Sequence, residues 1–72
     1  MSKWIKEDLD RRFNYHPPKP DQVEKYTAIR ASVKEVAELI NSACPESRER
    51  SLSITKLEEA IFWANASIAR NE

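Results

Sequence analysis

The stretch DQVEKYTAIRASVKEVAELINSACPESRERSLSITKLEEAIFWANASIAR, residues 21–70, decides the fold. Its first half repeats apolar residues at intervals of three and four, at Tyr26, Ile29, Val33, Val36, Ile40 and Ala43. Its second half has the same spacing, at Ile54, Leu57, Ile61, Ala64 and Ile68. This spacing is typical of helices that pack along a heptad-like seam. The sequence therefore predicts helices over residues 21–43 and 47–70.

The connections predict how these helices are arranged. The link Cys44-Pro45-Glu46 is short, which favours an antiparallel pair. Asp21 and Glu24 resemble a capping box at the start of the first helix. Residues 14–20 hold three prolines, which favour a stiff, extended connector.

A further helix is predicted over residues 2–13, with Ser2 as its N-cap. Its apolar residues Trp4, Ile5, Leu9 and Phe13 share one face. The expected fold is all-α, in one domain over residues 1–72, with the N-terminal helix packed on an antiparallel helical hairpin. The helix over 47–70 is apolar on more than its seam, so a second copy is the simplest cover and a homo-oligomer is expected.

Composition excludes several classes of site. The chain has 72 residues, no Gly, one Cys and one His, and its formal net charge is zero. Without glycine there is no glycine-rich phosphate loop, and one Cys with one His cannot form a structural zinc site. We expect no metal and no cofactor. Zero net charge argues against binding to duplex nucleic acid, and no apolar run is long enough to span a membrane.

Catalysis is not expected from the residues present. His16 and Cys44 are the one candidate pair for nucleophilic chemistry, and no motif surrounds them. The connector is more informative, because Phe13, Tyr15 and His16 bring three rings together next to prolines. Phe13 is interpreted as a core residue. Tyr15 fits either the core or a platform for stacking a nucleobase, and the two interpretations stay open.

Cations lie at three places that suit an anionic ligand. Arg30 and Lys34 are one helical turn apart, where like charges repel mildly and an anion would relieve the repulsion. Arg11-Arg12 and Arg70 are plausible phosphate contacts as well. Arg70 lies near a helix C-terminus, where it also complements the helix dipole. For each residue, ordinary solvent exposure is the alternative.

Several segments together resemble the small phage anti-CBASS sponge proteins, where CBASS is the bacterial cyclic-oligonucleotide antiphage system. The segments are Phe13-Asn14-Tyr15-His16-Pro17-Pro18, Tyr26 to Arg30, Ser47-Arg48-Glu49 with Ser51-Leu52, Thr55 to Ala60, Trp63 to Ala66 and Ile68 to Asn71. The resemblance covers residues 13–71, and residues 1–12 match less clearly.

The resemblance implies a non-catalytic protein that sequesters cyclic dinucleotides such as cGAMP, with separate sites for cyclic trinucleotides. It implies a homohexamer with pockets between protomers, encoded by a phage and acting in the cytoplasm of the bacterial host. It further implies that Tyr15 stacks on a base, that Arg30 supplies the cation, and that His16 and Pro17 line the same pocket. Arg70 is the candidate for the trinucleotide site.

Two other classes of function remain open from the sequence. A small nucleic-acid regulator would use Arg48 and Arg50 against phosphate. A protein–protein adaptor would use the apolar face of the helix over 47–70.

Overall fold

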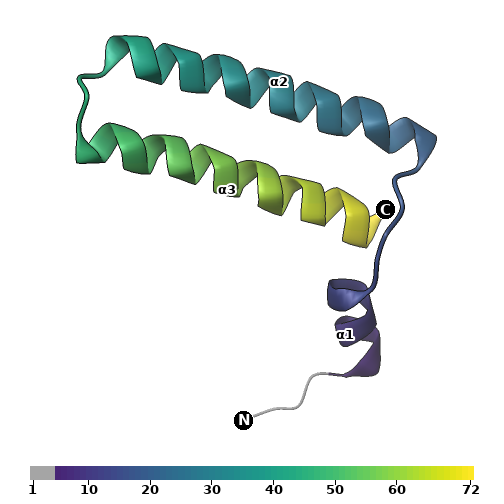
Figure 1. The fold of residues 1–72 in the computed structure, drawn as a ribbon. Coiled ribbons are helices and arrows are strands. Elements are labelled where there is room, and N and C mark those ends of the chain that lie inside the picture. The colour runs from purple at the N-terminus through teal and green to yellow at the C-terminus, as the bar shows by residue number, and fades with distance from the viewer. Residues whose placement is uncertain (1–4) are drawn as a thin grey trace.

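The computed structural model describes residues 5–72, and over that range the chain is all-helical, as predicted. The helices are α1 (Lys6–Phe13), α2 (Pro20–Ala43) and α3 (Arg48–Asn71). Figure 1 shows α2 and α3 side by side as an antiparallel hairpin, with α1 below the C-terminal end of α3. Residues 14–19 form the extended connector between α1 and α2.

The start of α2 is fixed by the proline-rich connector. Pro20 occupies the first turn, where its missing N–H leaves no bond unmade. The backbone N–H of the N-cap residue Lys19 donates to Oε1 of Gln22 at 3.0 Å. The capping pair is therefore Lys19 with Gln22, and the predicted pair of Asp21 with Glu24 is wrong. Pro20 is itself helical, which moves the cap upstream of Asp21.

The loop between α2 and α3 is held by the first residues of α3. Ser47 is the N-cap, and its Oγ accepts a hydrogen bond from the backbone N–H of Arg50 at 3.1 Å. The Arg50 guanidinium turns back and donates from Nη1 to the carbonyl oxygens of Asn41 and Cys44, each at 3.2 Å. One arginine thereby satisfies two carbonyls at the end of α2.

The seam between the helices follows the predicted pattern on α3 and departs from it on α2. All five predicted seam residues of α3, from Ile54 to Ile68, are half-buried. On α2, Val36 is 46% exposed and Ala37 is half-buried instead. A straight α-helix has 3.6 residues per turn and drifts from a strict heptad, which shifts the packed face by one residue here. The predicted place of Val36 in the seam is therefore wrong, and so is that of Ala43, which is exposed at the end of α2.

The open end of the hairpin is closed by a polar clasp, formed by Lys19, Gln22, Lys25 and Glu72. Gln22 is only 2% exposed, and its Nε2 lies 3.5 Å from both the Ile68 carbonyl oxygen and Glu72 Oε1. Nζ of Lys19 donates to the Glu72 carbonyl oxygen at 2.7 Å. Nζ of Lys25 donates to Glu72 Oε2 at 2.7 Å. The clasp joins the end of the connector to the end of α3.

The N-terminal helix does not pack on the hairpin as expected. It begins at Lys6, with Ile5 in an extended conformation as N-cap, while the predicted cap Ser2 and Trp4 lie outside the described residues. Figure 1 shows α1 standing away from the long faces of α2 and α3. Phe13 is 79% exposed, so its predicted core position is wrong. The connector fixes where α1 lies, and helical periodicity carries no information about that.

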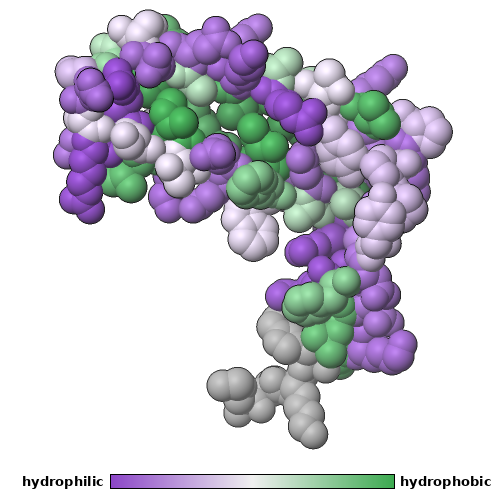
Figure 2. Space-filling view, in the orientation of Figure 1, coloured by the Kyte–Doolittle hydropathy of each residue, from purple (hydrophilic) through white to green (hydrophobic). Residues whose placement is uncertain are grey.

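The single chain leaves much apolar surface open. Among residues 5–72, no hydrophobic side chain is fully buried. Figure 2 shows apolar side chains lying open on the viewed face of the hairpin and of α1. The large exposed ones are Ile5, Leu9, Phe13, Tyr15, Val23, Val36, Leu39, Leu52, Phe62 and Trp63. No helix in the described range is both long and apolar enough to pass through a bilayer.

Candidate functional site

Where the connector meets the open end of the hairpin it borders an open pocket of about 390 Å³, here called the connector pocket. It is lined by Arg12, Asn14, Tyr15, His16, Pro18, Tyr26, Arg30, Asn65, Ala66, Ala69 and Arg70. Each of the three helices and the connector contributes to this wall. Its volume lies within the roughly 300–1,000 Å³ of small-molecule sites.

The wall of the connector pocket is positively charged. Three arginines, Arg12, Arg30 and Arg70, line it, and none of its lining residues is Asp or Glu. Arg30 is exposed, and no hydrogen bond or ion pair joins it to another described residue. The chain has a formal net charge of zero, so these three arginines make the pocket a local region of positive charge. Arginine offers planar, forked donors that suit phosphate oxygens.

Aromatic rings lie beside these charges. Tyr15 is 83% exposed, which removes the core interpretation and leaves its ring open to solvent. Tyr26 is half-buried, so it belongs to the seam and to the pocket wall at once. His16 has its Nε2 2.7 Å from the carbonyl oxygen of Arg11. Because a carbonyl only accepts, Nε2 carries the proton, and the ring is anchored to the end of α1.

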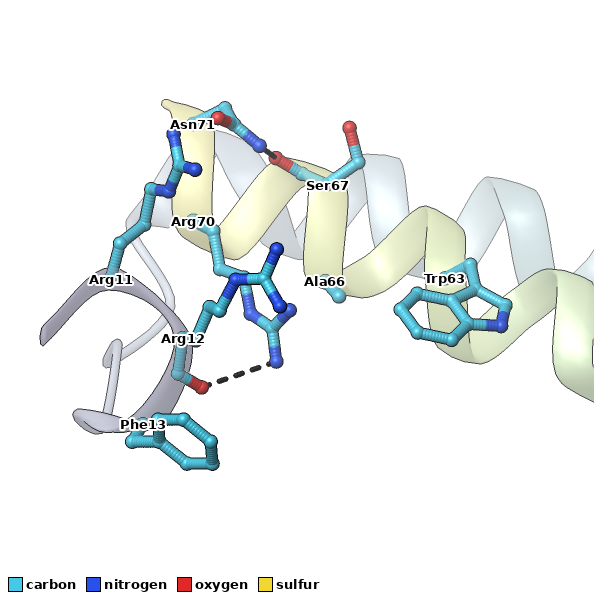
Figure 3. A pocket seen from close by; sticks show the side chains of 8 residues that line it. All are labelled: Arg11, Arg12, Phe13, Trp63, Ala66, Ser67, Arg70 and Asn71. Carbon is cyan, nitrogen blue, oxygen red and sulfur yellow. Dashed lines mark hydrogen bonds between the residues drawn. The ribbon is translucent and has the colours of Figure 1, made fainter. Parts of the chain in front are cut away.

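A second pocket of about 520 Å³, the helix-end pocket, lies between α1 and the last turns of α3. Figure 3 shows the guanidinium groups of Arg12 and Arg70 close together, with Phe13 and Trp63 beyond them on either side. Trp63 is 70% exposed. The lining residues are Arg11, Arg12, Phe13, Trp63, Ala66, Ser67, Arg70 and Asn71. None of these residues carries a negative charge, so this pocket also favours an anion.

Two of the arginines connect the pockets. Arg12, Ala66 and Arg70 line both of them. Arg70 donates from Nη2 to the carbonyl oxygen of Arg12 at 3.2 Å, the long dashed line in Figure 3. Arg11, in the helix-end pocket, is 3.3 Å from Asp8 Oδ1, so part of its charge is balanced on α1. Arg70 therefore lies where its guanidinium can contact a ligand in either pocket.

The sequence-predicted site residues divide into two groups. The connector pocket brings together four of them, Tyr15, His16, Arg30 and Arg70. Pro17 and Lys34 line neither pocket. The pocket wall also contains Arg12, which the sequence offered as a phosphate contact, and four residues that were not predicted as site residues, Asn14, Pro18, Tyr26 and Asn65. Helical spacing could have indicated two of them. Tyr26 lies one turn before Arg30 on the same face of α2, and Asn65 lies one turn before Ala69 on the same face of α3.

Other chemistries find little support in the described part of the chain. His16 lies in the connector and Cys44 in the loop, at opposite ends of the hairpin in Figure 1, so the two form no catalytic pair. Within residues 5–72, no group of three or more His, Cys, Asp and Glu side chains is placed to hold a metal ion.

Comparison with known proteins assigns the chain to a family. The family model described as the Acb2/Tad1 hairpin domain matches residues 6–69, which includes all of α1 and α2 and most of α3. The chain belongs to the Acb2/Tad1 hairpin-domain family. No curated protein and no solved structure matches it.

The Acb2/Tad1 family has a general function. These proteins are anti-CBASS sponges, which sequester cyclic oligonucleotides. A sponge binds its ligand without a chemical step. The arginine-rich, ring-lined pockets of this chain suit ligands that combine phosphates with bases.

Proposed function

We propose that this protein sequesters cyclic dinucleotides such as cGAMP in the connector pocket, and so keeps them from a CBASS effector. The observation that carries the proposal is the joining of Tyr15, Arg30 and Arg70 in one acid-free wall. Tyr15 stacks on a base, and the guanidinium groups bind the phosphates. The site of action is the cytoplasm of an infected bacterium, and the gene belongs to the phage.

The charge distribution supports a small anionic ligand over a long nucleic acid. Duplex binders need many phosphate contacts and a broad basic surface. Here the positive charge is local and the chain is neutral. Of the two arginines that the sequence offered to duplex phosphate, Arg50 is engaged with the carbonyls at the end of α2.

We further propose that the helix-end pocket is a second site, for cyclic trinucleotides. Its support is a pair of exposed rings, Phe13 and Trp63, flanking arginines that include Arg70. A larger ring of three nucleotides offers more phosphates and bases than a dinucleotide. Arg70, expected from the sequence to serve trinucleotides, then contributes to both sites.

The working form that we propose is a symmetric homo-oligomer, a hexamer. The support is physical, because a small chain with no fully buried hydrophobic side chain among its described residues needs further burial. A cyclic dinucleotide is close to two-fold symmetric, and a two-fold interface presents each residue twice. One Tyr15 and one Arg30 from each copy would then hold both halves of the ligand.

Calorimetric titration with cGAMP tests the proposal. The native protein should bind tightly, near one ligand per two chains, and heat denaturation should return the ligand unchanged. Arg30→Ala should weaken binding more than Lys34→Ala, which removes a cation one turn further along α2 and outside the pocket. Absence of binding by both di- and trinucleotides would overturn the proposal, and a cleaved ligand would show an enzyme instead.

A second candidate, a protein–protein adaptor, is favoured by one observation, the exposed apolar side chains of α3. Leu52, Phe62 and Trp63 are open in the single chain. An adaptor would bind a host protein through them and would ignore cyclic nucleotides. The same titration separates the two candidates, because only the sponge responds to cGAMP.

A further inference from the structure

Asn65 on α3 is a polar residue without a matching partner. It lines the connector pocket between Ala64 and Ala66, and it is half-buried. Its Oδ1 is buried and accepts no hydrogen bond from any described residue.

An unpaired buried acceptor lowers stability, because it loses its hydrogen bonds to water and gains none in exchange. Alanine would avoid that loss, and alanine already occupies the positions before and after it. The missing donor must therefore come from outside the single chain. Because Asn65 forms part of the pocket wall, a ligand bound in the connector pocket is the nearest source of that donor. A side-chain amide turns about one soft torsion, so its oxygen can rotate toward an incoming donor.

We propose that the side-chain amide of Asn65 reads an adenine base in the connector pocket, an inference that rests on the proposed sequestration of cyclic dinucleotides. Adenine presents a donor, the N6 amino group, beside an acceptor, N7, and an amide matches both atoms. Guanine presents two acceptors, O6 and N7, at the same edge, and these oppose the amide oxygen. At this edge the amide makes two complementary hydrogen bonds to adenine, whereas to guanine it can only donate from Nδ2, so Asn65 favours an adenine-containing ligand.

The charged side chains of the pocket wall cannot accept a hydrogen bond from the adenine amino group. The charged groups there are cations, Arg12, Arg30 and Arg70, which suit phosphates and guanine acceptors. No carboxylate lines the pocket to accept from an amino group. Asn14 is the other side-chain amide of the wall, and it is exposed. Asn65 is thus the side-chain amide of the wall whose oxygen is buried.

The test compares the dissociation constants of cyclic di-AMP and cyclic di-GMP for the native protein and for Asn65→Ala. The substitution should weaken cyclic di-AMP about ten-fold more than cyclic di-GMP, the size expected for one bidentate base contact. Asn41→Ala, which removes an exposed amide far from the pocket, should leave both constants unchanged. The thermal midpoint of free Asn65→Ala should equal or exceed that of the native protein, because the unpaired acceptor is gone.

Three outcomes have distinct meanings. An equal loss for both ligands overturns the inference and leaves the proposed function standing. A lower thermal midpoint with unchanged affinities also overturns it, and identifies Asn65 as a structural residue paired across an interface between copies. If the native protein binds neither ligand, the proposed function fails and the inference fails with it.

Discussion

Arg70 of α3 donates from Nη2 to the main-chain carbonyl oxygen of Arg12 at 3.2 Å, and this bond joins the last turn of α1 to the end of the hairpin. The two residues are far apart in sequence, and they line both pockets. The bond uses part of one guanidinium and leaves its other donors for a ligand. The bond therefore holds the last turn of α1 against the end of α3, beside both pockets.

Arg70→Ala should therefore weaken cyclic di- and trinucleotides together. Losing one hydrogen-bonded charge contact costs about 1.5–3 kcal/mol, or roughly ten-fold to 150-fold in Kd. Arg30→Ala should affect only the dinucleotide, because Arg30 lines the connector pocket alone. Titration of both ligands against both variants measures this. A loss confined to trinucleotides in Arg70→Ala would show that Arg70 does not serve the connector pocket.

We expect the ring of Tyr15 to stack on a nucleobase and to contribute little to the stability of the free protein. Tyr15→Ala should weaken cyclic dinucleotide binding by roughly 1–3 kcal/mol per stacked base, which is about a five-fold to 150-fold rise in Kd. The ring is exposed in the chain, so the thermal midpoint of the free protein should stay within error of native. Tyr15→Phe keeps the ring and serves as the control. Equal losses in the Phe and Ala variants would assign the effect to the hydroxyl instead.

The hairpin could be predicted from sequence because residues close together in the chain determine its helices and its loop. The apolar spacing of Ile54 to Ile68 fixes which face of α3 packs, and Pro45 with Ser47 fixes the loop. The error at Val36 came from the small difference between a heptad and a helical turn. The start of α2 was missed because Pro20 can be the first helical residue, which moves the cap to Lys19.

The site could be predicted only in part, since its assembly depends on long-range placement. Tyr15 and Arg30 were found as a ring and a cation that suit a nucleotide, and the pocket does join them. Phe13 was misplaced because one apolar face predicts burial without saying against what. The unpaired oxygen of Asn65 has no sequence signal, because pairing is a property of the folded neighbourhood.

The clasp at the open end should give the protein a defined pH dependence. The hydrogen bond from Lys25, with smaller contributions from Gln22 and Lys19, lowers the pKa of Glu72 below its ordinary 4.5. The Glu72 bond likewise raises the pKa of Lys25 above 10.5. The stabilisation is then complete between about pH 4.5 and 10.5. It is lost below that window as Glu72 protonates, and above it as Lys25 deprotonates.

Thermal melts of the native protein and Glu72→Gln across this range test the clasp. The native protein should melt slightly higher at pH 7, and the difference should shrink as pH falls through the lowered pKa of Glu72. Both groups are partly exposed, so the difference should also shrink in high salt. Glu59→Gln, in the exposed pair with Lys56, is the control and should change little at any pH. A pH-independent difference would contradict the ionic role of Glu72.

Oligomer formation should depend on apolar residues that the single chain leaves open. Leu39 is 65% exposed on α2, and a buried leucine contributes roughly 1.5–3 kcal/mol relative to an exposed one. Leu39→Ser should shift the native oligomer toward smaller species at micromolar concentration, as measured by light scattering during gel filtration. Glu38→Ser, a neighbouring exposed position, should leave the molar mass unchanged. Leu39→Ser with the native mass and melting temperature would place the interface elsewhere, and a monomeric native protein would refute assembly altogether.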